Sequence, residues 1–155
     1  MDKNEFMARA IQLAAENVNN GGGPFGAVIV KNGEIVGEGV NRVSSNNDPT
    51  AHAEVQAIRN ACKNLSTFQL NGCEIYTSCE PCPMCFASIY WARLDKVYFA
   101  ANHSDADEAG FDDGLIYREL KVEMQQRKIP FEEIVHELKL LPFQEWDQKE
   151  DKTSY

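Results

Sequence analysis

The sequence has little positive charge, no long apolar segment and few cysteines outside one short stretch, and each shortage excludes a class of protein. Lysine and arginine number 15 against 24 aspartates and glutamates, so the net charge is −9. Because RNA binding needs clustered lysine and arginine to neutralise phosphates, a nucleic-acid partner is disfavoured. No apolar run approaches membrane-spanning length, and charged residues interrupt the first 18 positions, where a signal peptide needs a continuous apolar core. We therefore expect a soluble, cytoplasmic protein with no membrane partner.

The cysteine pattern points away from disulfides. There are five cysteines: Cys62, Cys73, Cys79, Cys82 and Cys85. The last three fall within seven residues, and such crowding in a cytoplasmic chain favours metal or redox chemistry. With 155 residues, 43% of them hydrophobic, the chain is long enough for one domain with a substantial core, so we expect a single domain over residues 1–155.

Hydrophobic periodicity and turn residues predict that strands alternate with helices. Helices are expected at about residues 2–19, 51–64, 83–93, 111–120 and 143–149, and strands at about residues 25–30, 34–40, 73–77, 96–101 and 131–138. Asp2 and Glu5 form a capping box for the first helix, and Asn32-Gly33 predicts a tight hairpin between the first two strands. The alternation predicts an α/β fold, in which helices cover both faces of a single mixed sheet of about five strands.

The glycine-rich segment at residues 21–26 (Gly-Gly-Gly-Pro-Phe-Gly) formally matches the dinucleotide-binding pattern G-x-G-x-x-G. That function requires the pattern to follow a strand and to open a helix, whereas here it follows a helix and opens a strand. We reject the dinucleotide interpretation. The glycines are expected to end the helix and to let the backbone approach a neighbouring group closely.

Two short segments some thirty residues apart carry the chemistry. Residues 50–54 read Thr-Ala-His-Ala-Glu, and residues 81–85 read Pro-Cys-Pro-Met-Cys. A His-x-Glu pair followed by Pro-Cys-x-x-Cys is the signature of zinc-dependent nucleobase deaminases. The three metal ligands would be His52, Cys82 and Cys85, which leave the fourth position of the zinc ion open. Glu54 would stay off the metal and transfer protons.

The other cysteines and histidines fit this interpretation without a role in it. Cys79 would extend the cysteine run towards the iron–sulfur pattern C-x₂-C-x₂-C-x₃-C-P, but the fourth cysteine is missing, since position 89 is Ile89. A purely structural zinc site would normally close the fourth ligand position. We expect Cys62, Cys73 and Cys79 to be packed thiols, and we assign no role to His103 or His136.

Taken together, these residues resemble those of bacterial guanine deaminases of the cytidine-deaminase-like fold. The resemblance runs nearly end to end and includes residues 23–27, 41, 48–54, 77–85, 89–93, 108–113, 142–144 and 155. The zinc motif marks only the superfamily, whereas the Ile-Tyr-Trp run, the Gly-Phe-Asp-Asp run and the aromatic tail are similar to guanine deaminases. The resemblance implies hydrolytic deamination of guanine to xanthine and ammonia, with one zinc ion per subunit.

The resemblance also implies roles for individual residues. Phe25 would stack on the purine, Asn41 would hydrogen-bond to its polar edge, and Asp113 would be a second proton-handling carboxylate near the leaving amine. Three further substrate-binding candidates are Ala53, Trp91 and Tyr155. Without the resemblance, Phe25 would be interpreted as core, Asn41 as a strand-end cap and Asp113 as part of a helix N-cap.

In the resembled family the C-terminal segment is exchanged between two subunits, and its terminal tyrosine covers the partner's active site. The resemblance therefore implies a homodimer in which residues 131–155 are swapped. This tail contains Phe143, Trp146 and Tyr155, which is more aromatic surface than a solvated extension needs.

Three rival functions remain open. A tRNA adenosine deaminase shares the zinc motif but needs a basic surface, which the net charge of −9 argues against. A deaminase of guanosine or another nucleoside would differ only in the shape of its pocket, and for the same reason triazine or pteridine amines could be side substrates. A non-catalytic zinc-binding module would keep the three metal ligands but has no need for Glu54.

Overall fold

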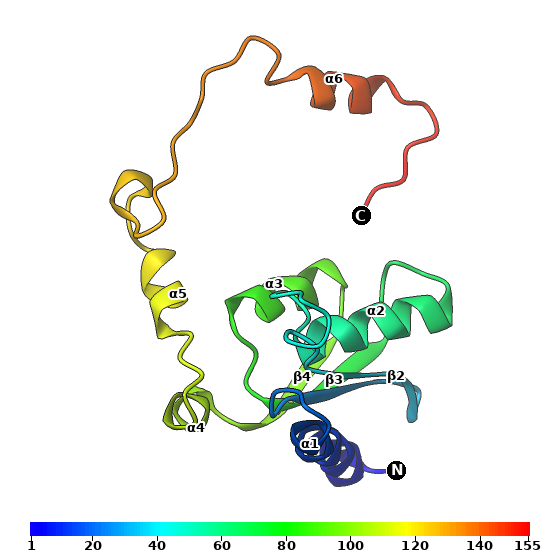
Figure 1. Ribbon diagram of the computed structural model, residues 1–155. Coiled ribbons are helices and arrows are strands. Elements are labelled where there is room, and N and C mark those ends of the chain that lie inside the picture. Colours follow the sequence, from blue (N-terminus) through cyan, green and yellow to red (C-terminus); the bar gives the residue numbers. More distant parts are fainter. The chain divides into compact units, whose positions relative to one another are not determined.

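The computed structural model describes all 155 residues, and the chain divides into two compact units, residues 1–113 and 114–155. The first unit contains the whole sheet, and the second contains short helices joined by irregular segments (Figure 1). Our expectation of one domain over residues 1–155 stays a prediction. No helix in the structure is both long and apolar enough to cross a membrane.

The first unit has a mixed α/β architecture. Its elements are α1 (Lys3–Asn19), β1 (Gly26–Lys31), β2 (Glu34–Val40), α2 (Ala53–Leu65), β3 (Cys73–Cys79), α3 (Pro83–Trp91), β4 (Lys96–Ala101) and α4 (His103–Glu108). The strand order is β2-β1-β3-β4, with β1 antiparallel to both neighbours and β3 parallel to β4. This single mixed sheet with flanking helices confirms the predicted fold class.

Two local predictions are confirmed at the level of single residues. The Asp2 side chain accepts from the backbone N–H of Glu5, and the Glu5 side chain accepts from that of Asp2, which completes the capping box of α1. Asn32 and Gly33 both have positive φ, 51° and 79°, and they join the paired residues Lys31 and Glu34 in a tight hairpin.

Helices lie on both faces of the sheet (Figure 1). Alternate residues of a strand point to opposite faces, and each face has its own core. On one face, Val28 and Tyr76 pack against Phe6 of α1. On the other face, the neighbouring strand residues Ile29 and Ile75 pack against α2 and α3. The helices therefore cover both faces, as the alternating pattern predicted.

Small residues let α2 lie unusually close to the sheet. The helix presents Ala53, Ala57 and Ala61, which are fully buried. Opposite them stand Gly37 and Gly39 of β2, and a Cβ atom on Gly39 would collide with the carbonyl oxygen of Ala53. Because backbone meets backbone here, the first turn of α2 is fixed relative to the strands.

The parallel strands β3 and β4 bring two loops to one edge of the sheet. Their carboxyl ends are aligned, since Cys79 pairs with Ala101. The loop after β3 leads into α3, and the residue after β4 caps α4. The sequence predicted no helix between the strand at 96–101 and the helix at 111–120, but Asn102 and Asp105 form a second capping box that starts α4 there.

The second unit contains α5 (Gly114–Glu119), a 3₁₀ helix η1 (Met124–Gln126) and α6 (Leu141–Gln148). The predicted fifth strand at residues 131–138 is wrong, and the sheet has four strands. A strand is stable only when its backbone groups pair with a neighbour, and this segment has no strand beside it. Its β-branched residues, Ile134 and Val135, are 79% and 84% exposed.

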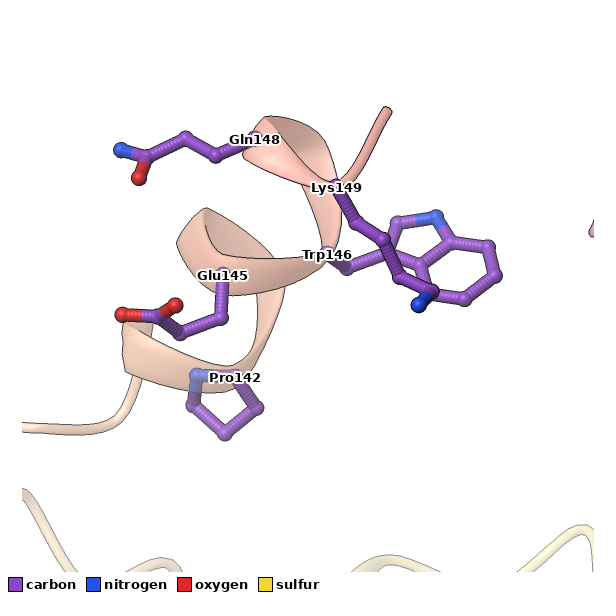
Figure 2. A pocket seen from close by; sticks show the side chains of 5 residues that line it. All are labelled: Pro142, Glu145, Trp146, Gln148 and Lys149. Carbon is purple, nitrogen blue, oxygen red and sulfur yellow. The ribbon is translucent and has the colours of Figure 1, made fainter. Parts of the chain in front are cut away.

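A surface pocket on α6 is lined by Pro142, Glu145, Trp146, Gln148 and Lys149 (Figure 2). All five residues come from the helix itself or the residue that follows it. None of them belongs to the residues that the sequence assigned to metal or to proton transfer.

Candidate active site

The three expected metal ligands come from the starts of two helices. His52 is the N-cap residue of α2, and Cys82 is the N-cap residue of α3. Pro83 occupies the first turn of α3, where its missing N–H costs nothing, and Cys85 follows on the same turn. The helix starts therefore converge on one point and carry the ligands with them.

The spacing of the three donor atoms fits a zinc ion. Nδ1 of His52 lies 3.5 Å from Sγ of Cys82 and 3.4 Å from Sγ of Cys85, and all three ligand atoms lie within 4.8 Å of one another. Tetrahedral zinc with ordinary bond lengths places nitrogen and sulfur ligands about 3.6 Å apart. The donor set, one imidazole and two thiols, is also one that zinc prefers.

The charges at the site favour a cation. A hydrogen bond from Cys85, helped by the contact with His52 and opposed by burial, lowers the pKa of the Cys82 thiol to about 4. The same hydrogen bond raises the pKa of Cys85, and its burial adds to this shift. The contact with Cys82 raises the pKa of His52. The pair of thiols thus carries one thiolate at neutral pH, facing the imidazole.

Glu54 is buried beside this cluster, with 5% of its surface exposed. Burial raises the pKa of its carboxyl group, and hydrogen bonds from Cys85 and Thr77 act in the opposite direction. The hydroxyl of Thr77 lies 2.7 Å from Oε1 of Glu54 and 3.0 Å from the carbonyl oxygen of Cys79. A buried carboxyl group with a raised pKa is suited to both accepting and releasing a proton.

Thr77 is a residue that the sequence did not single out. It is fully buried on the face of β3 that looks towards α2. Threonine is common in strands, so nothing in the local pattern distinguishes this hydroxyl from an ordinary strand residue. Its contact with Glu54 spans 23 positions and appears only once the sheet is formed.

Hydrogen bonds hold the glycine-rich loop against the end of β2. The amide nitrogen of Asn17 donates to the carbonyl oxygens of Gly23 and Asn41, both at 2.9 Å. The backbone N–H of Asn41 donates to the carbonyl oxygen of Phe25, and a Cβ atom on Gly23 would lie 3.1 Å from Cγ of Asn41. The predicted close backbone approach of these glycines is confirmed, and Phe25 and Asn41 are neighbours.

Asp113 stands in a cluster with two other titratable residues. Its Oδ2 atom lies 3.3 Å from Nδ1 of His103, and Nε2 of the same ring lies 3.2 Å from Oε2 of Glu80. The carbonyl oxygen of Cys79, the residue before Glu80, contacts the hydroxyl of Thr77 and so links this cluster to Glu54. Burial, together with the charges of Glu54, Asp113 and Glu80, raises the pKa of Cys79 to about 11. We expected no role for His103, and the structure places it between two carboxylates.

The remaining substrate-binding candidates are Ala53, Trp91 and Tyr155, and the first lies beside the metal ligands. Ala53 is fully buried between His52 and Glu54. Trp91 ends α3 with 62% of its surface exposed, about 13 Å along the helix from Cys82 by helix geometry. Tyr155 is the last residue of the second unit. The structure therefore brings Ala53 to the metal cluster and leaves Trp91 at the far end of the helix.

The other thiols are packed as expected. Cys73 and Cys79 are buried, Cys62 packs against the core on the α2 side of the sheet, and all five cysteines are free of disulfides. The iron–sulfur alternative has no fourth thiol, since Ile89 belongs to the same core. The only group of metal-binding side chains is the one made by His52, Cys82 and Cys85.

Comparisons with known proteins match this site. The sequence profile of the cytidine and deoxycytidylate deaminase zinc-binding region matches residues 1–101. The guanine deaminase of Bacillus subtilis is 55% identical, with 100% of both chains covered. The tRNA-specific adenosine deaminase of Aquifex aeolicus is 45% identical, covering 65% of this chain and 67% of its own.

Solved structures show the same order of similarity. The X-ray structure of the Bacillus subtilis guanine deaminase matches with a TM-score of 0.98 and covers 100% of this chain and 99% of that one. A guanine deaminase from Nitrosomonas europaea matches with a TM-score of 0.70 at 32% identity, covering 73% and 66% of the two chains. The similarity to the Bacillus protein includes the second unit, whereas the tRNA-specific relative covers about two thirds of the chain. The chain belongs to the cytidine and deoxycytidylate deaminase family and, within it, to the guanine deaminases.

Proposed function

We propose that this chain catalyses the hydrolytic deamination of guanine to xanthine and ammonia, in the cytoplasm, as a step of purine catabolism or salvage. The observation that carries the proposal is a buried carboxyl group, Glu54, beside three converging zinc ligands. A non-catalytic zinc module would have no use for a buried carboxyl group there, because burying it is costly. The full-length similarity to a guanine deaminase supports guanine as the substrate.

One zinc ion per subunit would be held by His52, Cys82 and Cys85. When bound, zinc lowers the pKa of a water molecule to about 7 and so supplies a nucleophile at neutral pH. The 3.4 and 3.5 Å distances between the imidazole nitrogen and the two sulfurs support this assignment. Because the pKa of Cys82 is lowered, this residue would meet the zinc ion as a thiolate, the form of cysteine that binds metal.

Glu54 would accept the proton that the attacking water loses and deliver it to a ring nitrogen of guanine. Thr77 donates a hydrogen bond to Oε1 of this carboxyl group and so fixes its orientation beside the metal ligands. Burial raises the pKa of Glu54, which favours its acceptance of a proton. Asp113 would handle protons near the leaving amine, so that the amine departs as ammonia.

The purine would lie between the glycine-rich loop and the start of α2. Phe25 would stack on the base, and its ring is held edge-on by Phe111 at a centroid distance of 5.0 Å. Oδ1 of Asn41 accepts from the backbone N–H of Val43, so its Nδ2 group would donate to the base. The backbone N–H of Ala53, in the first turn of α2, would be a further donor.

Trp91 and Tyr155 would act in an assembly of two chains. We propose a homodimer in which residues 131–155 are exchanged and Tyr155 covers the partner's active site. Apolar side chains on α3, namely Phe86, Tyr90 and Trp91, are more than half exposed in the single chain, which supports a partner surface there. Native mass measurement and crosslinking between an α3 position and a tail position would test this arrangement.

The activity is tested by ammonia release from zinc-loaded protein with guanine, guanosine, adenine and cytosine in parallel. We expect release from guanine well above that from the other three, with xanthine as the second product. Release mainly from guanosine would keep the metal chemistry and overturn the roles of Phe25 and Asn41. If zinc-loaded protein releases ammonia from none of the four substrates, the proposed activity is contradicted, and a polynucleotide substrate or a non-catalytic module is favoured.

A further inference from the structure

A histidine outside the zinc motif is held between two carboxylates at the edge of the sheet where β3 and β4 end. Glu80 follows β3, and its backbone N–H donates to the carbonyl oxygen of Ala101 at 2.8 Å. Its Oε1 atom accepts the backbone N–H of His103 at 3.2 Å, while its Oε2 atom lies 3.2 Å from Nε2 of the imidazole. Glu80 therefore fixes both the backbone and the ring of His103.

The other side of the same ring meets Asp113, with 3.3 Å between Nδ1 and Oδ2. An imidazole can hydrogen-bond through both of its nitrogens only when its two partners are placed on opposite sides of the ring, as Glu80 and Asp113 are. His103 and Glu80 are each about one third exposed, and ion pairs with that exposure add little to the stability of a fold. What this cluster supplies is a fixed direction for the side chain of Asp113.

Asp113 needs such support from a side chain because its own backbone segment offers little. Residues 111–113 have no regular secondary structure and follow Gly110, whose φ is 93°. His103, by contrast, begins α4, which is started by the capping box of Asn102 and Asp105. Cys79 precedes Glu80, and its carbonyl oxygen lies 3.0 Å from the hydroxyl of Thr77, which also lies 2.7 Å from Oε1 of Glu54. The cluster is thus linked through Thr77 to the catalytic carboxyl group.

We propose that His103 is a positioning residue for the deamination, in which Nδ1 directs the carboxylate of Asp113 towards the substrate and Glu80 holds the ring. The inference rests on the proposed function, in which Asp113 handles protons near the leaving amine. Losing the positioning contact is expected to lower kcat while leaving KM nearly unchanged, because binding of the base depends on other residues. A misdirected catalytic group typically costs about ten- to a hundred-fold in rate.

A double-mutant cycle tests whether His103 acts through Asp113. The variants are His103→Ala, Asp113→Asn and the combination, each assayed for kcat and KM on guanine as the zinc-loaded enzyme. We expect each single variant to lose at least about ten-fold in kcat, and the combination to lose no more than Asp113→Asn alone. Multiplying losses would mean that His103 acts independently of Asp113 and would overturn the proposal.

Two conservative variants separate the two contacts of the ring and remain informative if His103→Ala fails to fold. An asparagine places its amide nitrogen near the position of Nδ1, and a glutamine places its amide nitrogen near that of Nε2. We therefore expect His103→Asn to retain more turnover than His103→Gln, with full zinc content in both. A retained activity in His103→Gln that exceeds that of His103→Asn would overturn the role of Nδ1.

A readout that does not depend on turnover separates this inference from the proposed function. The ring-nitrogen NMR signals of His103 are compared between wild type and Asp113→Asn, both loaded with zinc. A shifted Nδ1 signal supports the contact, and an unchanged signal in an active enzyme overturns the positioning role alone. Wild-type protein that releases ammonia from none of the four substrates would overturn both proposals, even if the Nδ1 signal shifts.

Discussion

The two units of the chain differ in the burial of their apolar residues. In the first unit, residues such as Val28, Ile29 and Ile75 are fully buried between the sheet and its helices. In the second unit no side chain is buried, and Ile134 and Val135 are more than three quarters exposed. The second unit is therefore not stabilised by a core of its own, and its apolar surface is suited to packing on another surface.

The chemistry follows the same division. The zinc ligands, Glu54 and Asp113 all belong to the first unit, where packing fixes their directions. The second unit contributes Tyr155, whose proposed role requires it to cover a site formed by a partner chain. In the proposed arrangement the first unit carries the reaction, and the second unit completes the pocket of the partner chain.

The largest effect is expected from a change at the catalytic centre of the first unit. Replacing Glu54 by Gln should lower turnover by about 10²- to 10⁴-fold while zinc content stays at the wild-type level, because the proton carrier is lost and the ligands are not. The matched control, His52→Ala, should lose both zinc and turnover. Metal analysis and ammonia release measure the two quantities, and near-normal turnover in Glu54→Gln would rule out the proton-transfer role.

The next largest effect concerns stability, and it compares an isoleucine-to-alanine substitution in the first unit with the same substitution in the second. Ile29→Ala should lower the free energy of unfolding by about 2–5 kcal/mol, since Ile29 is fully buried. Ile134→Ala, at a residue that is 79% exposed, should change it by less than about 0.5 kcal/mol in the dilute, monomeric chain. Denaturant unfolding measures both values. A large loss in monomeric Ile134→Ala would break the contrast between the units.

A smaller effect is expected from the end of the second unit. Deleting Tyr155 should lower kcat/KM for guanine by roughly ten-fold and leave zinc content unchanged, because one aromatic contact over the pocket is lost. Tyr155→Phe, which keeps the ring, should lose less than the deletion. If the deletion has full activity, the second unit does not cover the site and the proposed exchange of tails loses its function.

The smallest effect concerns a polar loop of the first unit that is held by hydrogen bonds instead of burial. The hydroxyl of Thr50, at 2.6 Å, is the main cause of the lowered pKa of Asp48, and the backbone N–H of Thr50 adds to it. Since the folded pKa is lowered, the stabilisation is complete above the unfolded value of about 3.9 and is lost as pH falls through the folded value. In a carboxyl NMR titration, Thr50→Ala should move the Asp48 midpoint upwards, whereas Thr50→Ser should keep it low.

Prediction from the sequence succeeded where the signal was local. The hairpin needed only Asn32-Gly33, and the convergence of His52 and Cys82 followed from two helix starts. Thr77 and His103 were missed because their contacts join positions 23 or 10 residues away, and neither residue type is unusual in its own segment. The fifth strand was wrong for a related reason, since strand pairing depends on a neighbour that residues 131–138 do not have.

The glycines of β2 have a consequence for changing the substrate by design. Because α2 touches the sheet through its backbone, a side chain added at Gly39 would collide with the backbone of Ala53, between His52 and Glu54, and one added at Gly37 would collide with Ala57 and Ala61. Either change would displace the helix whose start holds both catalytic-centre residues, so this contact is closed to gradual remodelling. The glycine-rich loop is equally tight, and new specificities are therefore expected to arise through the tail, where side chains are exposed and can change size without moving the reaction centre.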